Sequence, residues 1–143
     1  MFIIDRVNEV NIGVFYTSVK QHRENVNVDK SLWTISIEDE IECFKRTIGN
    51  LWKDVDGKCA WGIHVLGNSL SIEILGKNRE NEHLKIAKFV KDDYCESWHG
   101  YPADYRKKRN DKPPEKVLIE WRDKGYIKKH QIGKIRSGKV CNL

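Results

Sequence analysis

The chain lacks any long apolar run. In its 143 residues the apolar stretches are only a few residues long, whereas a membrane-spanning helix needs about 18 or more consecutive apolar residues. The first residues, Met1 to Arg6, also lack the basic segment followed by a longer apolar run that marks a secretion signal. The sequence therefore predicts no membrane partner and a cytoplasmic location.

Paired cysteines and the common cofactor motifs are also missing. The four cysteines lie 16, 36 and 46 residues apart, with no Cys-x-x-Cys pair and no histidine at zinc-finger spacing. There is no glycine-rich phosphate loop, no dinucleotide fingerprint, no zinc-deaminase signature and no Gly-x-Ser-x-Gly elbow. We therefore expect reduced thiols, no metal site and no cofactor.

Large aromatic residues and one strongly amphipathic segment are present. Five Trp, five Tyr and four Phe exclude a disordered chain, which would lack large groups to bury. A helix is predicted over 36–53, with Ser36 as its N-cap and acidic residues in its first turn. The apolar residues that recur at helical spacing on one face are Ile37, Ile41, Phe44, Ile48 and Leu51.

The sequence between 59 and 90 predicts an antiparallel meander. Gly67-Asn68 is a two-residue turn signal, and a hairpin closed there places apolar residues on one face. The predicted pairs are Val65 with Leu70, Ile63 with Ile72, and Trp61 with Ile74. A third strand is expected at about 83–90, and another at about 11–17.

The composition changes after Asp92. An aromatic loop, Trp98 to Pro102, precedes the basic run of residues 106–109. Pro113 and Pro114 then open a helix that Gly125 ends, and a last helix is expected over 129–137. The predicted fold class is α+β: an antiparallel β-meander packed on an amphipathic helix, followed by a C-terminal basic αα-hairpin. We expect a single domain over 1–143, with a sheet and helix core in 1–91 and the aromatic loop and basic hairpin in 92–143.

Charge is distributed unevenly along the chain. Residues 1–98 hold 13 Lys or Arg and 16 Asp or Glu, a net charge of −3, whereas residues 99–143 hold 13 and 5, a net charge of +8. A positive surface of this kind attracts polyanions, of which nucleic acids are the commonest. The sequence therefore predicts a small nucleic-acid-binding domain, without distinguishing RNA from DNA, and leaves the oligomeric state open.

The candidate binding residues combine cations for phosphates with aromatic rings for base stacking. They are Tyr101, Tyr105, Arg106, Lys107, Lys108, Arg109, Lys128, Lys129, Lys134, Arg136 and Lys139. The closing helices also match the pattern of a helix-turn-helix, although any packed helical hairpin with a solvated lysine face does so. An acidic protein partner, met by an inhibitor, immunity or regulatory factor, is an alternative.

A metal-free ribonuclease is the enzymatic alternative. His99 and Glu96 would act as its acid/base pair, with Arg106 or Arg109 stabilising the charge on the phosphate. His64, expected on the exposed face of the hairpin and diagonal to Glu73, is a weaker second candidate. A structural role is the simpler interpretation of each histidine, and the sequence leaves open whether the protein is an enzyme.

Overall fold

A mixed five-stranded sheet forms the main layer of the fold. The structure, a computed structural model, describes residues 2–25, 29–94 and 96–143. The strands of this main sheet lie in the order β1 (Val7–Asn11), β2 (Val14–Thr17), β8 (Ser97–Pro102), β7 (Ala87–Lys91) and β4 (Cys59–Gly62). The β2–β8 pair is parallel and the other neighbours are antiparallel. The predicted α+β class is confirmed.

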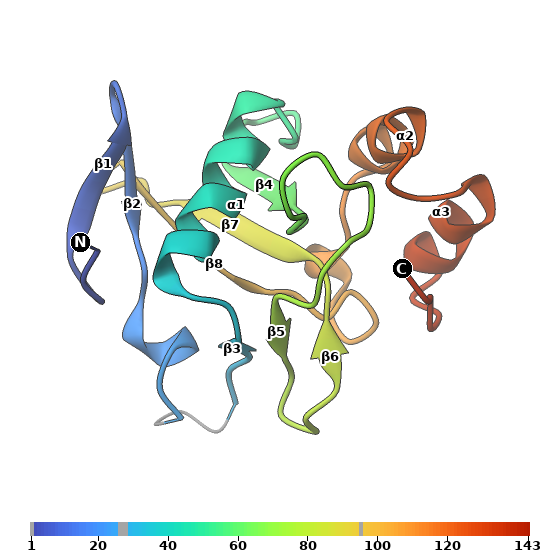
Figure 1. The fold of residues 1–143 in the computed structure, drawn as a ribbon, viewed down its shortest axis with the longest axis horizontal. Coiled ribbons are helices and arrows are strands. Elements are labelled where there is room, and N and C mark those ends of the chain that lie inside the picture. Colours follow the sequence, from blue (N-terminus) through green and yellow to red (C-terminus); the bar gives the residue numbers. More distant parts are fainter. Residues whose placement is uncertain (1, 26–28, 95) are drawn as a thin grey trace.

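Helix α1 (Ile37–Gly49) covers one face of this sheet (Figure 1). The Ser36 hydroxyl accepts a hydrogen bond from the Asp39 amide at 3.1 Å, as the capping pattern predicts. Phe44 is fully buried, with its ring 5.3 Å from that of Phe89 on β7. The expectation for Leu51 is wrong, because this residue lies beyond the helix at φ 57° and is 69% exposed.

A buried carboxylate joins α1 to the N-terminal strands. Glu40 is fully buried and accepts hydrogen bonds from the Tyr16 hydroxyl at 2.5 Å and the Ser18 hydroxyl at 2.7 Å. The Arg23 guanidinium donates two more, at 2.6 and 3.0 Å. Since a buried charge is costly unless it is paired, these four donors are what permit Glu40 to face the core.

The strand pairing predicted around Gly67-Asn68 is wrong. Strand β4 pairs with β7, with Cys59 opposite Val90, and residues 70–74 form no strand beyond a single bridge from His64 to Glu73. That bridge is shifted by two residues from the predicted register, and of the residues predicted to face inward after the turn only Ile72 is buried. Leu70 is 55% exposed, because the chain leaves the sheet here as a loop instead of turning back along β4.

A second, three-stranded sheet packs against the first. Its strands lie in the order β3 (Leu32–Trp33), β5 (Gly76–Lys77) and β6 (His83–Leu84). A Cβ atom on Gly76 would lie 2.2 Å from the Pro102 ring of β8 and 2.6 Å from the Leu32 carbonyl. The close approach of the two sheets therefore requires glycine at this position of β5. Short 3₁₀ helices, η1 (Lys20–His22) and η2 (Arg109–Asp111), flank the contact.

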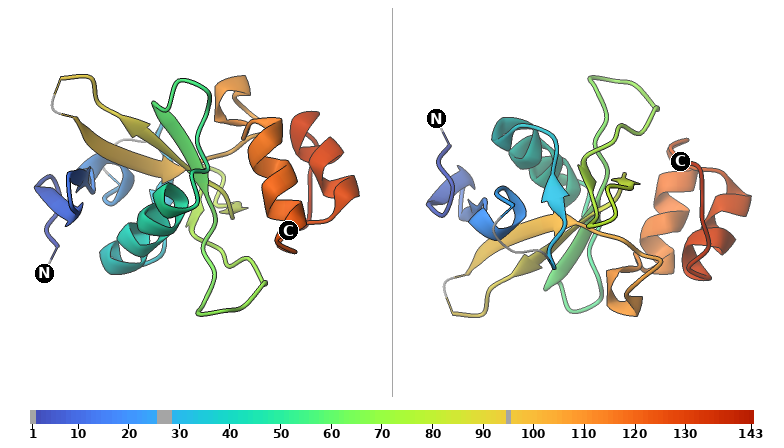
Figure 2. Two further views of the ribbon diagram at one scale, coloured as in Figure 1. Left: turned by 90° about the horizontal axis from the view of Figure 1, so that it is seen from above. Right: turned by 90° about the horizontal axis from the view of Figure 1, so that it is seen from below.

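The closing helical hairpin is confirmed. Helices α2 (Glu115–Asp123) and α3 (Lys129–Arg136) lie together at the end of the molecule opposite the N-terminal strands (Figure 2). Trp121 of α2 is fully buried, edge-on to Trp52 at 5.8 Å, and Ile135 of α3 is fully buried. Gly125 ends α2 with φ 91°, a conformation that favours glycine.

The segment expected to be an aromatic loop is instead strand β8, at the centre of the main sheet. Its side chains alternate between the two faces of the sheet. Trp98 is buried beside Phe44 of α1, whereas His99 and Tyr101 are half-buried on the face away from α1. The strand therefore serves as core on one side and carries polar aromatic side chains on the other.

Candidate functional site

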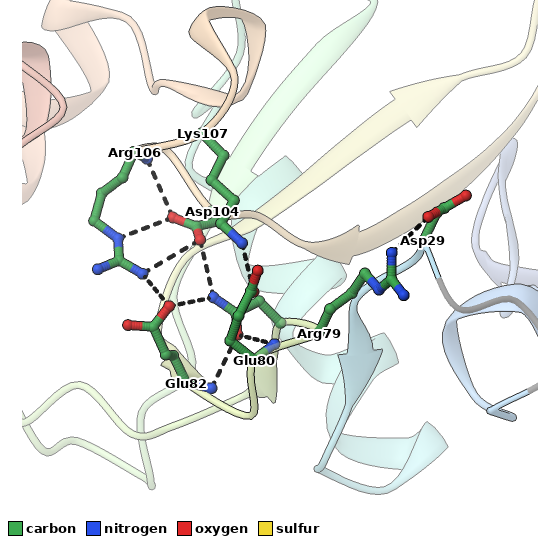
Figure 3. Close-up of polar contacts among 8 residues, drawn as sticks. Asp29, Arg79, Glu80, Glu82, Asp104, Arg106 and Lys107 are labelled. Atoms are coloured by element: carbon green, nitrogen blue, oxygen red, sulfur yellow. Dashed lines mark hydrogen bonds and ion pairs between the residues drawn. The ribbon is translucent and has the colours of Figure 1, made fainter.

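Two cations of the predicted binding set are already paired with acidic residues (Figure 3). The Arg106 guanidinium lies 3.1 Å from the Asp104 carboxylate and 3.0 Å from that of Glu82. The Lys107 ammonium lies 2.5 Å from the Glu80 carboxylate. These ion pairs neutralise Arg106 and Lys107 locally, so neither presents a free charge to a polyanion.

This paired cluster fastens the turn between β5 and β6 to the loop of residues 104–112. Buried Asn78 donates to Asp104 at 3.1 Å and to Glu82 at 2.9 Å. Burial raises the pKa of Asp104, but hydrogen bonds from Arg106 and Asn78 outweigh it and hold that pKa below its usual value. The carboxylate is thus an ionised structural bridge between the turn and the loop.

The remaining cations of the set, apart from Arg136, form what we call the basic surface. They are exposed, and within residues 2–25, 29–94 and 96–143 they have no ion-pair partner. Its members are Lys108, Arg109, Lys128, Lys129, Lys134 and Lys139. Arg136 is exposed as well, but its guanidinium lies 2.8 Å from the Glu115 carboxylate.

The basic surface has two parts, one in the loop of residues 104–112 and one in and around α3, and hydrogen bonds join them. The Lys112 ammonium donates to the Arg136 carbonyl at 3.0 Å, and the Tyr105 hydroxyl donates to the Lys139 carbonyl at 2.7 Å. These bonds hold the C-terminal end of α3 against the loop that carries Lys108. Tyr105 is only 8% exposed and packs in the core, so its ring is not available for the base stacking expected from the sequence.

A cleft of about 240 Å³ opens beside this loop. We call it the His22 cleft. The His22 ring is stacked on that of Tyr101, with 5.2 Å between ring centroids and 18° between planes. The remaining lining comes from the chain before β3, the β5–β6 turn and the loop, including Lys30, Ser31, Asn78, Arg79, Pro102, Lys107 and Lys108.

His22 is held as a neutral ring with one acceptor nitrogen. Its Nδ1–H donates to the Ser31 carbonyl at 2.9 Å, because a carbonyl oxygen can only accept. The pKa of His22 is lowered to about 4, mainly by burial, with a smaller contribution from the nearby Lys30, His99 and Lys108 and an opposing one from the hydrogen bond to Ser31. Nε2 therefore carries a lone pair at neutral pH.

The Nε2 atom belongs to a side chain that lines the cleft, and it has no protein partner among the described residues. No hydrogen bond reaches it from any residue that the structure describes, and it is not among the polar atoms sealed from solvent. The residue as a whole is 5% exposed. Nε2 is therefore a solvent-accessible acceptor on a largely buried side chain, where water or a ligand that donates a hydrogen can bind it.

The carboxylates that line the cleft are all occupied. Asp111 accepts from the Tyr101 hydroxyl at 2.6 Å and lies 3.6 Å from the Lys88 ammonium. Asp104 is bound by Arg106, and the Asp29 carboxylate lies 2.7 Å from the Arg79 guanidinium (Figure 3). Lys30 and Lys108 have no carboxylate partner in the described part of the chain. The charges of the lining that are not balanced by an ion pair in the described chain are therefore the positive charges of Lys30 and Lys108.

The proposed catalytic histidines lie in different surroundings. His99 is half-buried on β8, where burial lowers its pKa and Asp92 opposes this. Glu96 lies exposed in the preceding turn at φ 53° and makes no hydrogen bond to His99. The pairing of Glu96 with His99 stays a hypothesis. His64 was expected to be exposed, but it is only 8% exposed and lines a hollow together with residues of α1.

Sequence reasoning missed His22. It follows no motif, and the ring that it contacts, Tyr101, is 79 residues further along the chain. Only the tertiary pairing of β2 with β8 places η1 beside the end of β8. The sequence did single out Tyr101, because it precedes a basic run. It gave no indication that the ring of Tyr101 contacts His22.

The stability of the protein is expected to decrease as the pH falls from about 6.5 to about 4. An unfolded histidine binds a proton near pH 6.5, whereas folded His22 does so only near 4. Between these values the unfolded state holds the extra proton, and the loss amounts to about 2 to 3 kcal/mol. Urea unfolding at several pH values measures this loss.

The matched control is His22→Asn, whose amide can keep the hydrogen bond to Ser31. Carboxylates also titrate in this range, so the difference between wild type and variant is the quantity to compare. Equal pH dependence in the two proteins would contradict a neutral His22.

Comparison with protein-family models, with curated protein sequences and with solved structures gives no significant match to this chain. Within the described residues, no helix is long and apolar enough to cross a membrane. The same residues contain no group of three or more His, Cys, Asp or Glu side chains suited to a metal ion. Inferences about function therefore rest on the basic surface and the His22 cleft.

Proposed function

We propose that the protein binds single-stranded nucleic acid through the basic surface. The observation that carries the proposal is the set of exposed cations on α3 and loop 104–112 that have no acidic partner in the described chain. A nucleic-acid backbone carries one phosphate per nucleotide. Each contact between such a phosphate and a protein cation releases counterions that had condensed on the nucleic acid. We favour single strands because aromatic rings bind unstacked bases, and half-buried His99 and Tyr101 lie on a sheet face beside the loop, with His22 stacked on one side of the Tyr101 ring.

The pairing of the two helices also bears on the proposal. In a helix-turn-helix the second helix presents side chains to a DNA groove. Here α3 has eight residues, and its C-terminal end is fastened to loop 104–112 through Lys112 and Tyr105. Because α3 is attached to this loop, the two form one continuous surface. Such a surface suits a flexible single-stranded nucleic acid better than it suits the insertion of a helix into a DNA groove.

Binding of a labelled single-stranded RNA is expected to weaken about a hundredfold between 50 and 200 mM salt, because four to six contacts are lost to competing cations. Fluorescence anisotropy measures the affinity. The triple variant Lys128→Ala, Lys129→Ala, Lys134→Ala should reduce the slope of log affinity against log salt by about 2. The matched control replaces Lys20, Lys45 and Lys58, exposed lysines in the acidic part of the chain, and should leave the slope unchanged.

Two results would contradict this proposal. Affinity independent of salt, or no binding, would favour the alternative of an acidic protein partner. A gel of the same samples shows whether the RNA stays intact. Cleaved RNA would instead favour the ribonuclease alternative, in which His99 takes part in acid/base chemistry.

A further inference from the structure

The His22 cleft offers two kinds of binding group to a ligand. One is Nε2 of His22, a solvent-accessible acceptor on a buried side chain, with no protein donor among the described residues. The others are Lys30 and Lys108, which have no carboxylate partner in the described part of the chain, where every carboxylate of the lining is bound by a cation. A ligand that fits must therefore donate one hydrogen bond and carry a negative charge beside the donor.

The donor group that suits Nε2 is a hydroxyl. Because Nδ1–H is fixed on the Ser31 carbonyl, neutral His22 can only accept through Nε2. An ionised phosphate oxygen also only accepts, so it cannot satisfy this nitrogen. A ribose 2′-hydroxyl donates, and it lies next to a 3′-phosphate in every RNA chain.

The size and position of the cleft agree with a sugar and its phosphate. At about 240 Å³ it is smaller than the roughly 300–1,000 Å³ of pockets for drug-sized molecules. Lys108 belongs both to the lining of the cleft and to the basic surface. A single-stranded nucleic acid that follows the basic surface onto loop 104–112 therefore reaches the opening of the cleft.

We infer that the His22 cleft holds one ribonucleotide of a single-stranded RNA, with the ribose 2′-hydroxyl donating to Nε2 of His22 and the adjoining phosphate between Lys30 and Lys108. This inference rests on the proposed function and makes it more specific, because it selects RNA over DNA. The hydroxyl is the group by which a protein distinguishes the two at a single site. His22 is thus the residue that distinguishes RNA from DNA. The basic surface supplies the affinity that single-stranded RNA and single-stranded DNA share.

The first test compares three labelled oligonucleotides of one sequence: RNA, the corresponding DNA with uracil bases, and RNA with 2′-O-methyl groups. Wild-type protein is expected to bind RNA about five- to tenfold more tightly than DNA, as one added hydrogen bond to an otherwise unpartnered acceptor allows. The methylated strand keeps the ribose but has no hydrogen to donate. It is therefore expected to bind no more tightly than DNA.

The second test uses two substitutions that separate the nitrogens of the ring. His22→Asn keeps a donor near the position of Nδ1 and removes the acceptor, so the preference for RNA should fall to about onefold. His22→Gln places an amide oxygen near the position of Nε2 and should retain part of the preference. DNA affinity should stay unchanged in both variants, which also shows that each is folded.

The outcomes separate this inference from the proposed function. Equal affinity of the wild type for RNA and DNA, or an undiminished RNA preference in His22→Asn, would overturn the inference and leave the basic surface standing. Tight binding of the 2′-O-methyl strand would overturn the role of the hydroxyl. Failure to bind any of the three strands would overturn the proposed function, and the inference with it.

Discussion

Replacing Glu40 with alanine is expected to lower the free energy of unfolding by about 3 to 5 kcal/mol, the usual cost of removing one partner from a buried ion pair. The substitution leaves the Arg23 guanidinium, 10% exposed, without its carboxylate. The buried Tyr16 hydroxyl also loses its acceptor. Since these partners belong to β2 and the segment after it, the N-terminal strands should loosen from α1. Urea unfolding measures the loss.

The matched control is Glu42→Ala, two residues along the same helix. The Glu42 side chain is 69% exposed and its carboxylate lies 3.5 Å from the Lys45 ammonium. An exposed pair of this kind contributes about 0.5 kcal/mol or less. Equal unfolding midpoints for the two variants would mean that the Glu40 cluster does not hold the N-terminal strands in place.

Replacing Gly76 with alanine is expected to destabilise the protein by about 3 kcal/mol, at the upper end for overpacking. The new methyl group would lie 2.2 Å from the Pro102 ring and 2.6 Å from the Leu32 carbonyl oxygen. Because the Leu32 oxygen belongs to the backbone of β3, side-chain rotation cannot relieve that contact, and β5 must move relative to both β3 and β8. Thermal unfolding reports the lowered midpoint.

Gly133→Ala is the matched control, with the opposite sign. Gly133 lies within α3, and its added methyl group would have no atom within 4 Å. Alanine is favoured over glycine inside a helix, so this substitution should stabilise the protein by about 0.5 to 1 kcal/mol. If the two alanine variants unfolded at the same temperature, close sheet packing at Gly76 would not be the reason for its glycine.

The helices were predictable because their signals are local. Ser36 caps α1 and Gly125 ends α2, each through hydrogen bonds or dihedral angles of neighbouring residues. The pairing of the strands in the sheet was less predictable. Gly67-Asn68 predicted a hairpin, but β4 pairs with β7, which follows a segment of more than twenty residues that contains β5 and β6. Strand pairing depends on burial across the whole fold, which turn residues alone do not specify.

The candidate site was predictable in its charge but not in its pairing. The sequence places Arg106 and Lys108 in one basic run, yet the first is bound by Asp104 and Glu82 and the second has no acidic partner among the described residues. Asp104 lies only two residues before Arg106, but the fold brings Glu82 to the loop from 24 residues away. Counting charges along a sequence therefore identified the region, and only tertiary contacts separate structural cations from available ones.

The central position of β8 has a consequence for the order of folding. Its neighbours β2 and β7 come earlier in the chain, and until β8 is in place each exposes an unpaired edge. The parallel pair of Phe15 with Ser97 spans 82 residues, a long-range contact of the kind that slows folding. Insertion of this one strand joins the two halves of the sheet. The same step carries Tyr101 to His22, so the cleft is complete only when the sheet is.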